Sequence, residues 1–76
     1  MQNFSYISKA CELRQPGASP VPGRLASITA IGAVVEVSDP FAVSDTIVLA
    51  IRRSERRCRV MWRANRQVAM VFEDTA

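Results

Sequence analysis

The clearest structural signal in the sequence is the stretch Cys58-Arg59-Val60-Met61-Trp62-Arg63-Ala64, whose residues alternate in polarity. Its even-numbered positions hold Cys, Val, Trp and Ala, and its odd-numbered positions hold Arg, Met and Arg. Because successive side chains of a β-strand point to opposite faces, this alternation predicts a half-buried strand. Trp62 is then a core residue on the same face as Cys58. Arg59 and Arg63 are expected to face solvent.

Further runs of the same kind lie on both sides of this stretch. A polar link at 65–67 joins it to an apolar run at 68–72, in which alternate residues again share one face. Two such runs joined by a short link predict a β-hairpin. Residues 46–51 form another β-branched run, which we expect to end in a polar, basic connection over residues 52–57.

The first half of the chain repeats this pattern less regularly. Residues 24–29 and 33–37 are rich in β-branched residues and meet near Gly32, where we expect a bend or bulge. Residues 6–14 predict a first strand. Residues 16–23 hold most of the proline and glycine of the chain, so they predict an irregular loop.

Six short strands separated by turn signals predict an all-β domain. A chain of 76 residues has room for one domain, and closure into a barrel removes the exposed edges of so small a sheet. We therefore expect a single six-stranded antiparallel β-barrel over residues 1–76. The apolar runs are far shorter than the roughly 20 residues that a membrane-spanning helix needs, so no membrane span is expected.

The composition argues against several classes of site. The chain has no histidine, which is the commonest general base and metal ligand, and no nucleophile stands beside a base. We expect no catalytic activity, no metal and no resident cofactor. Cys11 and Cys58 are far apart in the sequence, and the N-terminal residues lack a signal-peptide pattern. These features favour a cytoplasmic protein with two buried, reduced thiols, although a disulfide between them also agrees with the sequence.

The charge is concentrated in the second half of the chain. Residues 52–76 carry seven arginines against three acidic residues, a net charge of +4, whereas residues 1–51 have a net charge of −1, which gives the +3 of the whole chain. Arginine binds phosphate or carboxylate through two parallel bonds and stacks on flat rings. Three interpretations stay open for the cluster: solubility, an anionic or nucleotide ligand, or an acidic protein partner. The cluster, named here the basic segment, consists of Arg52, Arg53, Arg56, Arg57, Arg59 and Arg63.

The order of these stretches resembles that of PilZ domains. In that family a C/A-x-V-x-W-R strand is followed by a G-V-x-F-type strand, and residues 58–63 and 68–73 are similar to this closing hairpin. Residues 39–51 resemble the segment that leads into the fourth strand, and residues 23–33 resemble the second strand and its glycine turn. The resemblance covers about residues 8–74. It implies a six-stranded barrel and, in many bacterial members, a receptor for cyclic di-GMP.

The resemblance also implies where a ligand would bind. PilZ domains hold cyclic di-GMP with an RxxxR pair ahead of the first strands and with a [D/N]xSxxG motif on the second strand. Aligned through Gly32, Ser27 stands at the acidic or amide position, and Thr29 stands at the serine position. A hydroxyl cannot present the two-point acceptor edge that reads a guanine. The arginine pair is missing, because Lys9 and Arg14 have the wrong spacing.

The leading hypothesis is therefore a non-catalytic PilZ-type binding module of bacterial cyclic di-GMP signalling. Its binding of the dinucleotide is expected to be weak or absent, and it would act through a protein partner or through self-association. An alternative is a functional receptor in which Arg24, Arg59 and Arg63 replace the missing pair near Thr29. A further alternative is a general nucleic-acid-binding barrel, which the small number of aromatic residues disfavours.

Overall fold

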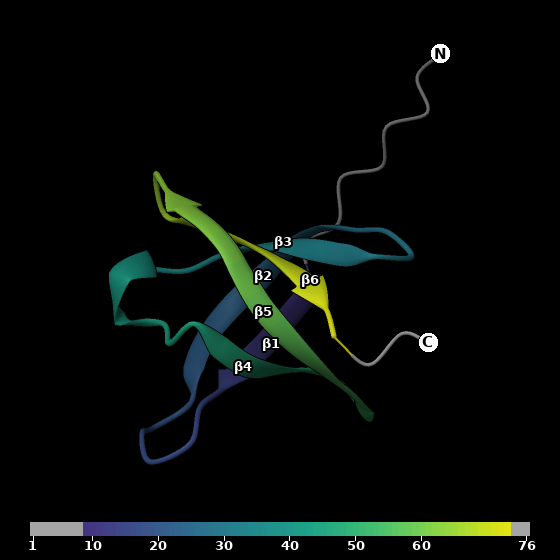
Figure 1. The fold of residues 1–76 in the computed structure, drawn as a ribbon, viewed down its shortest axis with the longest axis horizontal. Coiled ribbons are helices and arrows are strands. Elements are labelled where there is room, and N and C mark those ends of the chain that lie inside the picture. The colour runs from purple at the N-terminus through teal and green to yellow at the C-terminus, as the bar shows by residue number, and fades with distance from the viewer. Residues whose placement is uncertain (1–8, 74–76) are drawn as a thin grey trace.

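Six antiparallel strands close into a β-barrel in the computed structural model, which describes residues 9–73 (Figure 1). The strands are β1 (Lys9–Arg14), β2 (Val21–Ile28), β3 (Gly32–Glu36), β4 (Thr46–Ile51), β5 (Ser54–Ala64) and β6 (Gln67–Phe72), with a 3-10 turn, η1 (Pro40–Ala42), between β3 and β4. Around the barrel they follow the order β1-β2-β3-β6-β5-β4. The expected fold class, a six-stranded antiparallel barrel, is confirmed.

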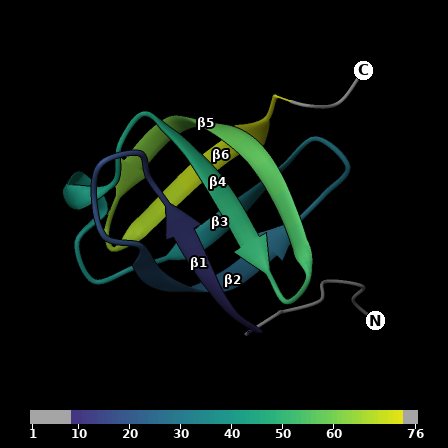
Figure 2. The same cartoon turned by 90° about the horizontal axis from the view of Figure 1, so that it is seen from below.

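Two pairings between strands that are not neighbours in the sequence close the barrel. β3 pairs with β6, which places Val35 opposite Val68, and β1 pairs with β4, which places Leu13 opposite Leu49. Figure 2 shows β1 and β4 side by side on the face nearest the viewer. All four of these side chains are at most 1% exposed, so both seams are packed from the inside.

The core is built from alternate residues of all six strands, as the period of two predicts. No polar or charged residue in the part from 9 to 73 is buried, and both cysteines are buried free thiols. The core consists of Cys11, Leu13, Leu25, Ala33, Val35, Val37, Val43, Ile47, Leu49, Cys58, Val68, Met70 and Phe72. In the described residues, no helix has the length and apolar character needed to cross a membrane.

Two expected connections are shorter than the sequence indicated. The loop predicted for residues 16–23 ends earlier, because β2 begins at Val21 and includes Pro22 and Gly23. Pro22 is tolerated there because β3 pairs with β2 only from Arg24 onward, so the missing N–H of Pro22 faces no second strand. The part of the predicted first strand at residues 6–8 lies outside the described residues.

The basic connection predicted for residues 52–57 is also replaced by regular structure. Arg52 adopts a left-handed conformation with φ of 55°, which allows a two-residue turn, and β5 begins at Ser54. Arg56 and Arg57 therefore lie in the ladder opposite Leu49 and Val48. A left-handed arginine gives no distinctive signal in a sequence, since Gly and Asn are the usual residues at such positions.

A β-bulge inverts the alternation in β5. Val60 pairs with Met70, but the next paired residue is Trp62, opposite Ala69, so Met61 is the extra residue. A one-residue shift moves every following side chain to the other face. Trp62 therefore lies on the outer surface with 50% of its area exposed, and the prediction that it is a core residue is wrong.

The same bulge also changes the face of β5 on which the Arg63 side chain lies. Arg63 lies opposite Val68, which is fully buried, so its side chain is on the inner face of β5. It is only 21% exposed. The prediction that Arg63 faces solvent is therefore wrong. Arg59 precedes the bulge and is exposed, as expected.

Candidate functional site

Thr29 and Gly32 of the PilZ-like motif form the tight turn between β2 and β3. The Thr29 Oγ1 accepts hydrogen bonds from the backbone N–H groups of Ile31 (3.2 Å) and Gly32 (3.3 Å). The Thr29 N–H donates to the Gly32 carbonyl at 2.8 Å. The hydroxyl at the serine position of the motif is thus already used to hold the turn.

Gly32 is required by the approach of β6. A Cβ at this position would collide with the carbonyl oxygen of Met70, and it would stand 3.2 Å from the Val71 Cα. These neighbours are backbone atoms and cannot move aside without breaking the β3–β6 ladder. The glycine of the motif is therefore explained by strand packing, with or without a ligand.

Ser27 lies in a row of residues that crosses four strands on the outer surface. It is opposite Val34 on β3, Val34 is opposite Ala69 on β6, and Ala69 is opposite Trp62 on β5. Ala69 is only 9% exposed although it points outward, which is consistent with cover from the indole ring opposite it. Ser27 thus faces an apolar surface.

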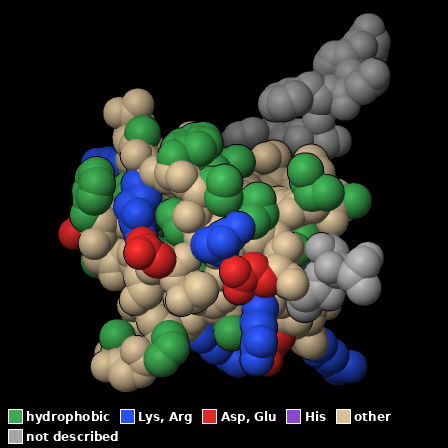
Figure 3. All heavy atoms as spheres, in the orientation of Figure 1, with side chains coloured by type: hydrophobic (Ala, Val, Ile, Leu, Met, Phe, Trp, Pro, Cys, Tyr) green, Lys and Arg blue, Asp and Glu red, His purple; other side chains and the backbone are tan. Residues whose placement is uncertain are grey.

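A shallow hollow of about 270 Å³ joins this row to the turn, and Ser27, Thr29 and Gly32 line it together with Met61 and Trp62. We name the surrounding surface the apolar face, which consists of Ile31, Val34, Met61, Trp62 and Val71. Figure 3 shows hydrophobic side chains gathered over β3, β5 and the β2–β3 turn. Ile31 is 71% exposed and Met61 is 56% exposed, so this surface is open to a partner.

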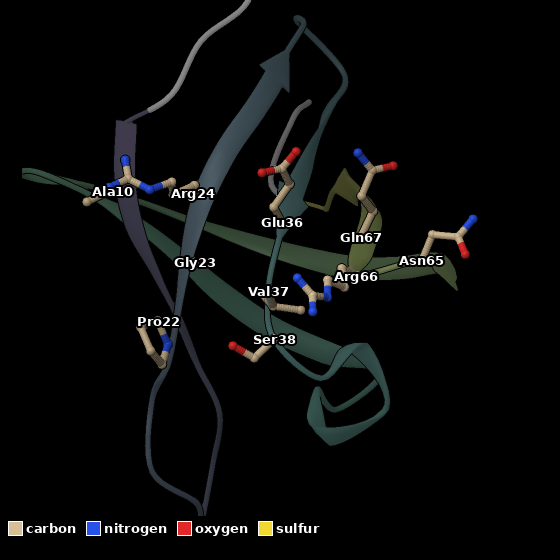
Figure 4. A pocket seen from close by; sticks show the side chains of 10 residues that line it. All are labelled: Ala10, Pro22, Gly23, Arg24, Glu36, Val37, Ser38, Asn65, Arg66 and Gln67. Atoms are coloured by element: carbon tan, nitrogen blue, oxygen red, sulfur yellow. The ribbon is translucent and has the colours of Figure 1, made fainter.

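Arg24, the fourth candidate ligand residue, lines a different hollow. It pairs with Glu36 on β3, two residues beyond the Val34 that pairs with Ser27, and with Ala10 on β1. This second hollow has a volume of about 650 Å³ and is polar (Figure 4). In Figure 4 the side chains of Arg24 and Arg66 come from different sides of the hollow, with Glu36 between them.

Arg66 is a candidate residue that sequence reasoning missed. It forms the β5–β6 turn with Asn65, and both residues have positive φ angles, 49° for Asn65 and 67° for Arg66. Two successive left-handed residues form the type I′ turn that joins two twisted strands, and asparagine is favoured at its first position. The asparagine in the polar link was therefore the available signal, although the second position usually holds glycine.

The basic segment does not form one surface. Arg63 is a structural residue: its Nη2 donates to the Val43 carbonyl and to the Asp45 carboxylate, both at 2.8 Å, and its Nε donates to the Pro40 carbonyl at 3.1 Å. The guanidinium carbon of Arg56 lies 4.0 Å from the centre of the Phe72 ring. These two arginines therefore make their contacts at opposite ends of β5.

The other arginines of the segment point in further directions. Arg59 is on the outer face with its Nε 3.9 Å from the Glu73 carboxylate, and Arg57 is on the outer face opposite Val48. Arg52 and Arg53 are at the tip of the β4–β5 turn. The structure therefore does not bring Arg24, Arg59 and Arg63 together beside Thr29 as a substitute clamp.

Comparison with protein-family models, with curated proteins and with solved structures gives no match to this chain. Among residues 9–73, no group of three or more Cys, Asp and Glu residues is placed to hold a metal ion. The function is therefore inferred from the two outer hollows, the apolar face and the placement of the arginines.

Proposed function

We propose that this chain is a non-catalytic PilZ-type binding module that binds cyclic di-GMP weakly or not at all and acts by binding a protein. One observation carries the proposal: the residues at the motif positions line an apolar hollow beside Trp62, and the arginines lie elsewhere. A dianionic dinucleotide needs charged donors at its phosphates, and no Lys or Arg is among the described residues that line this hollow.

The loss of charged contacts has a predictable size. Each hydrogen bond to a charged group contributes about 1.5–3 kcal/mol net, which corresponds to roughly tenfold to a hundredfold in affinity. The hydroxyl of Thr29 already accepts two N–H groups, so it has little capacity left for a ligand. The combined losses favour weak binding.

The apolar face supports the protein-binding part of the proposal. Trp and Met are enriched in protein interfaces, and an exposed cluster of large apolar side chains on a small soluble domain marks an interaction surface. Trp62 and Met61 lie at its centre, 50% and 56% exposed. A tryptophan that is half exposed when unbound can become a binding hot spot when a partner covers it.

Titration calorimetry with cyclic di-GMP tests the first part. We expect no saturable heat, or a dissociation constant weaker than about 100 μM, a free energy weaker than about −5.5 kcal/mol. Binding at a few micromolar that is lost in both Thr29→Ala and Arg24→Ala would overturn the proposal and establish a receptor with unusual contacts. Arg57→Ala is the matched control, since it removes one charge from the outer face away from both hollows.

Site-directed cross-linking in cells tests the second part. A photoreactive amino acid in place of Met61 should form one discrete protein adduct, whereas the same group in place of Ala18, an exposed loop residue, should not. An adduct of twice the chain mass would indicate self-association through the apolar face. Equal adducts from both positions, or none, would count against protein binding at this face.

A further inference from the structure

One end of the barrel is an apolar mouth surrounded by cations. Figure 2 shows that the start of β1 and the ends of β2 and β4 meet at this end of the barrel. The cavity there has a volume of about 490 Å³, within the range of about 300–1,000 Å³ typical of small-molecule sites. Its lining residues are Lys9, Leu25, Ile28, Leu49, Ile51, Arg52, Ser54, Arg56 and Phe72.

The floor and walls of the mouth are apolar. Leu25, Leu49 and Phe72 belong to the core and are 1–6% exposed, so the cavity reaches down to the barrel interior. Ile28, at the rim, is 41% exposed, so the apolar lining of the mouth continues to the solvent. An apolar group that entered the mouth would bury this surface and gain about 25 cal/mol per Å².

The rim is cationic: of the lining residues between 9 and 73, three are basic and none is acidic. Arg56 is held above the Phe72 ring at 4.0 Å, which fixes its guanidinium beside the apolar floor. The ion pairs within 4.0 Å among residues 9–73 include neither Lys9 nor Arg52. The acidic neighbour Glu55 points to the outer face, where it pairs with Arg14.

Arg52 is placed at the rim at a conformational cost. Its φ of 55° lies in the left-handed region, where a residue other than glycine or asparagine costs of order 1 kcal/mol or more. Glycine would relieve that strain but would remove the charge from the rim. An outlier of this kind is a reason to look for a role of the side chain.

We propose that this mouth binds a small amphiphilic anion, a single acyl-type chain that carries a carboxylate or phosphate head. The chain occupies the cavity over Leu25, Leu49 and Phe72, and the head meets the cations of the rim. A nucleotide is a poor match, because no carboxylate or amide side chain among the described lining residues can accept from the N–H groups of a base. The ligand is thus distinct in class from the partner of the apolar face.

Calorimetry on the full chain with dodecanoate below its micelle concentration tests the proposal. We expect saturable one-to-one binding, with dodecanol at least about tenfold weaker because it lacks the charge, and with inorganic phosphate silent because it lacks the chain. Dodecyl phosphate compares the two head groups. Binding to phosphatidylglycerol vesicles without binding to the monomeric amphiphile would overturn the proposal in favour of a membrane surface.

Variants locate the site. Arg52→Asn keeps a residue that tolerates the left-handed turn and should weaken dodecanoate binding about tenfold, as should Arg56→Gln. Arg57→Gln removes the same charge from the outer face and should leave the affinity unchanged. Equal weakening by all three variants would mean a nonspecific charge effect, and it would refute the site.

Spectroscopy separates the mouth from the apolar face. Amide resonances of Leu25, Leu49 and Phe72 should shift on titration, and the fluorescence of Trp62, on the outer surface, should not change. A change in Trp62 emission with silent mouth resonances would place the amphiphile on the apolar face instead. That result would contradict the proposal and leave the proposed protein-binding function open.

Discussion

Arg63 shows how much of the structure can depend on a single side chain. Its guanidinium donates hydrogen bonds to two carbonyls of the connection that contains η1 and to the Asp45 carboxylate. The bulge at Met61 places it there. A residue that the sequence suggested for ligand binding is therefore a structural link between β5 and the β3–β4 connection.

The Arg63→Met variant should be destabilised by about 1.5–3 kcal/mol, because carbonyls that now accept charged donors lose them. Asp45→Asn is the matched variant for the ion pair alone. The Asp45 side chain is 87% exposed, and a surface ion pair contributes only about 0–1 kcal/mol, so this change should be nearly neutral. Urea unfolding of the two variants measures the difference, and equal losses would contradict the dominant role of the carbonyl bonds.

Cys11 makes the stability depend on pH in alkaline solution. Burial raises the pKa of its thiol from 9.0 to about 11, since the thiolate is poorly solvated in the core. The unfolded chain loses this proton near pH 9 and the folded chain near pH 11, so stability is constant below pH 9 and falls between these values.

The expected loss is up to about 3 kcal/mol across that interval. Denaturant unfolding at pH 8, 9 and 10 checks it, with Cys11→Ala as the reference. Other groups that titrate in this range are common to both proteins, so the difference between the two curves isolates the thiol. Parallel curves would show that the thiol ionises as readily in the folded barrel as in the unfolded chain.

At the scale of the strand, the bulge in β5 determines which residues are available to a partner. Trp62→Ala should cost at most about 1 kcal/mol of stability, whereas loss of a buried tryptophan typically costs 3–5 kcal/mol. Iodide should quench the native tryptophan fluorescence, because half of the indole is in contact with solvent. A large loss of stability together with weak quenching would show that Trp62 is buried in the core, and it would contradict the bulge.

The strands that follow a simple alternation were predicted well from the sequence. β4 was predicted with its observed bounds and β6 to within one residue, because one face of each is buried and neither strand contains the extra residue of a bulge. The bulge in β5 could not be predicted, since one inserted residue leaves the sequence alternating while its faces are exchanged. The two-residue turn at Arg52 was missed because its left-handed conformation is imposed by the strands it joins.

The candidate site was predicted only in part for the same reason. Ser27, Thr29 and Gly32 are close in sequence, so their proximity in the fold follows from local structure. The separation of Arg24 from them depends on the register of β2 with β3, which includes another shift between Leu25 and Ser27. The mouth was not predicted, because its residues come from five different strands and the turn between β4 and β5.

At the scale of the whole molecule, closure gives every strand two partners. A closed sheet has no edge from which it can fray. Backbone amides of all six strands should therefore exchange with solvent through global unfolding, with similar free energies. Native-state hydrogen exchange at low denaturant concentration measures this directly, and early exchange confined to β1 would mean that the β1–β4 seam opens by itself.

The position of β6 also has a consequence for synthesis of the protein on the ribosome. β6 is the last of the six described strands to be translated, and it lies between β3 and β5, where it completes both the hairpin with β5 and the seam with β3. Until Phe72 has left the exit tunnel, β3 and β5 each lack a partner and expose their backbone groups and apolar faces. We therefore expect the nascent chain to expose aggregation-prone strand edges until nearly all of its described length is free of the ribosome.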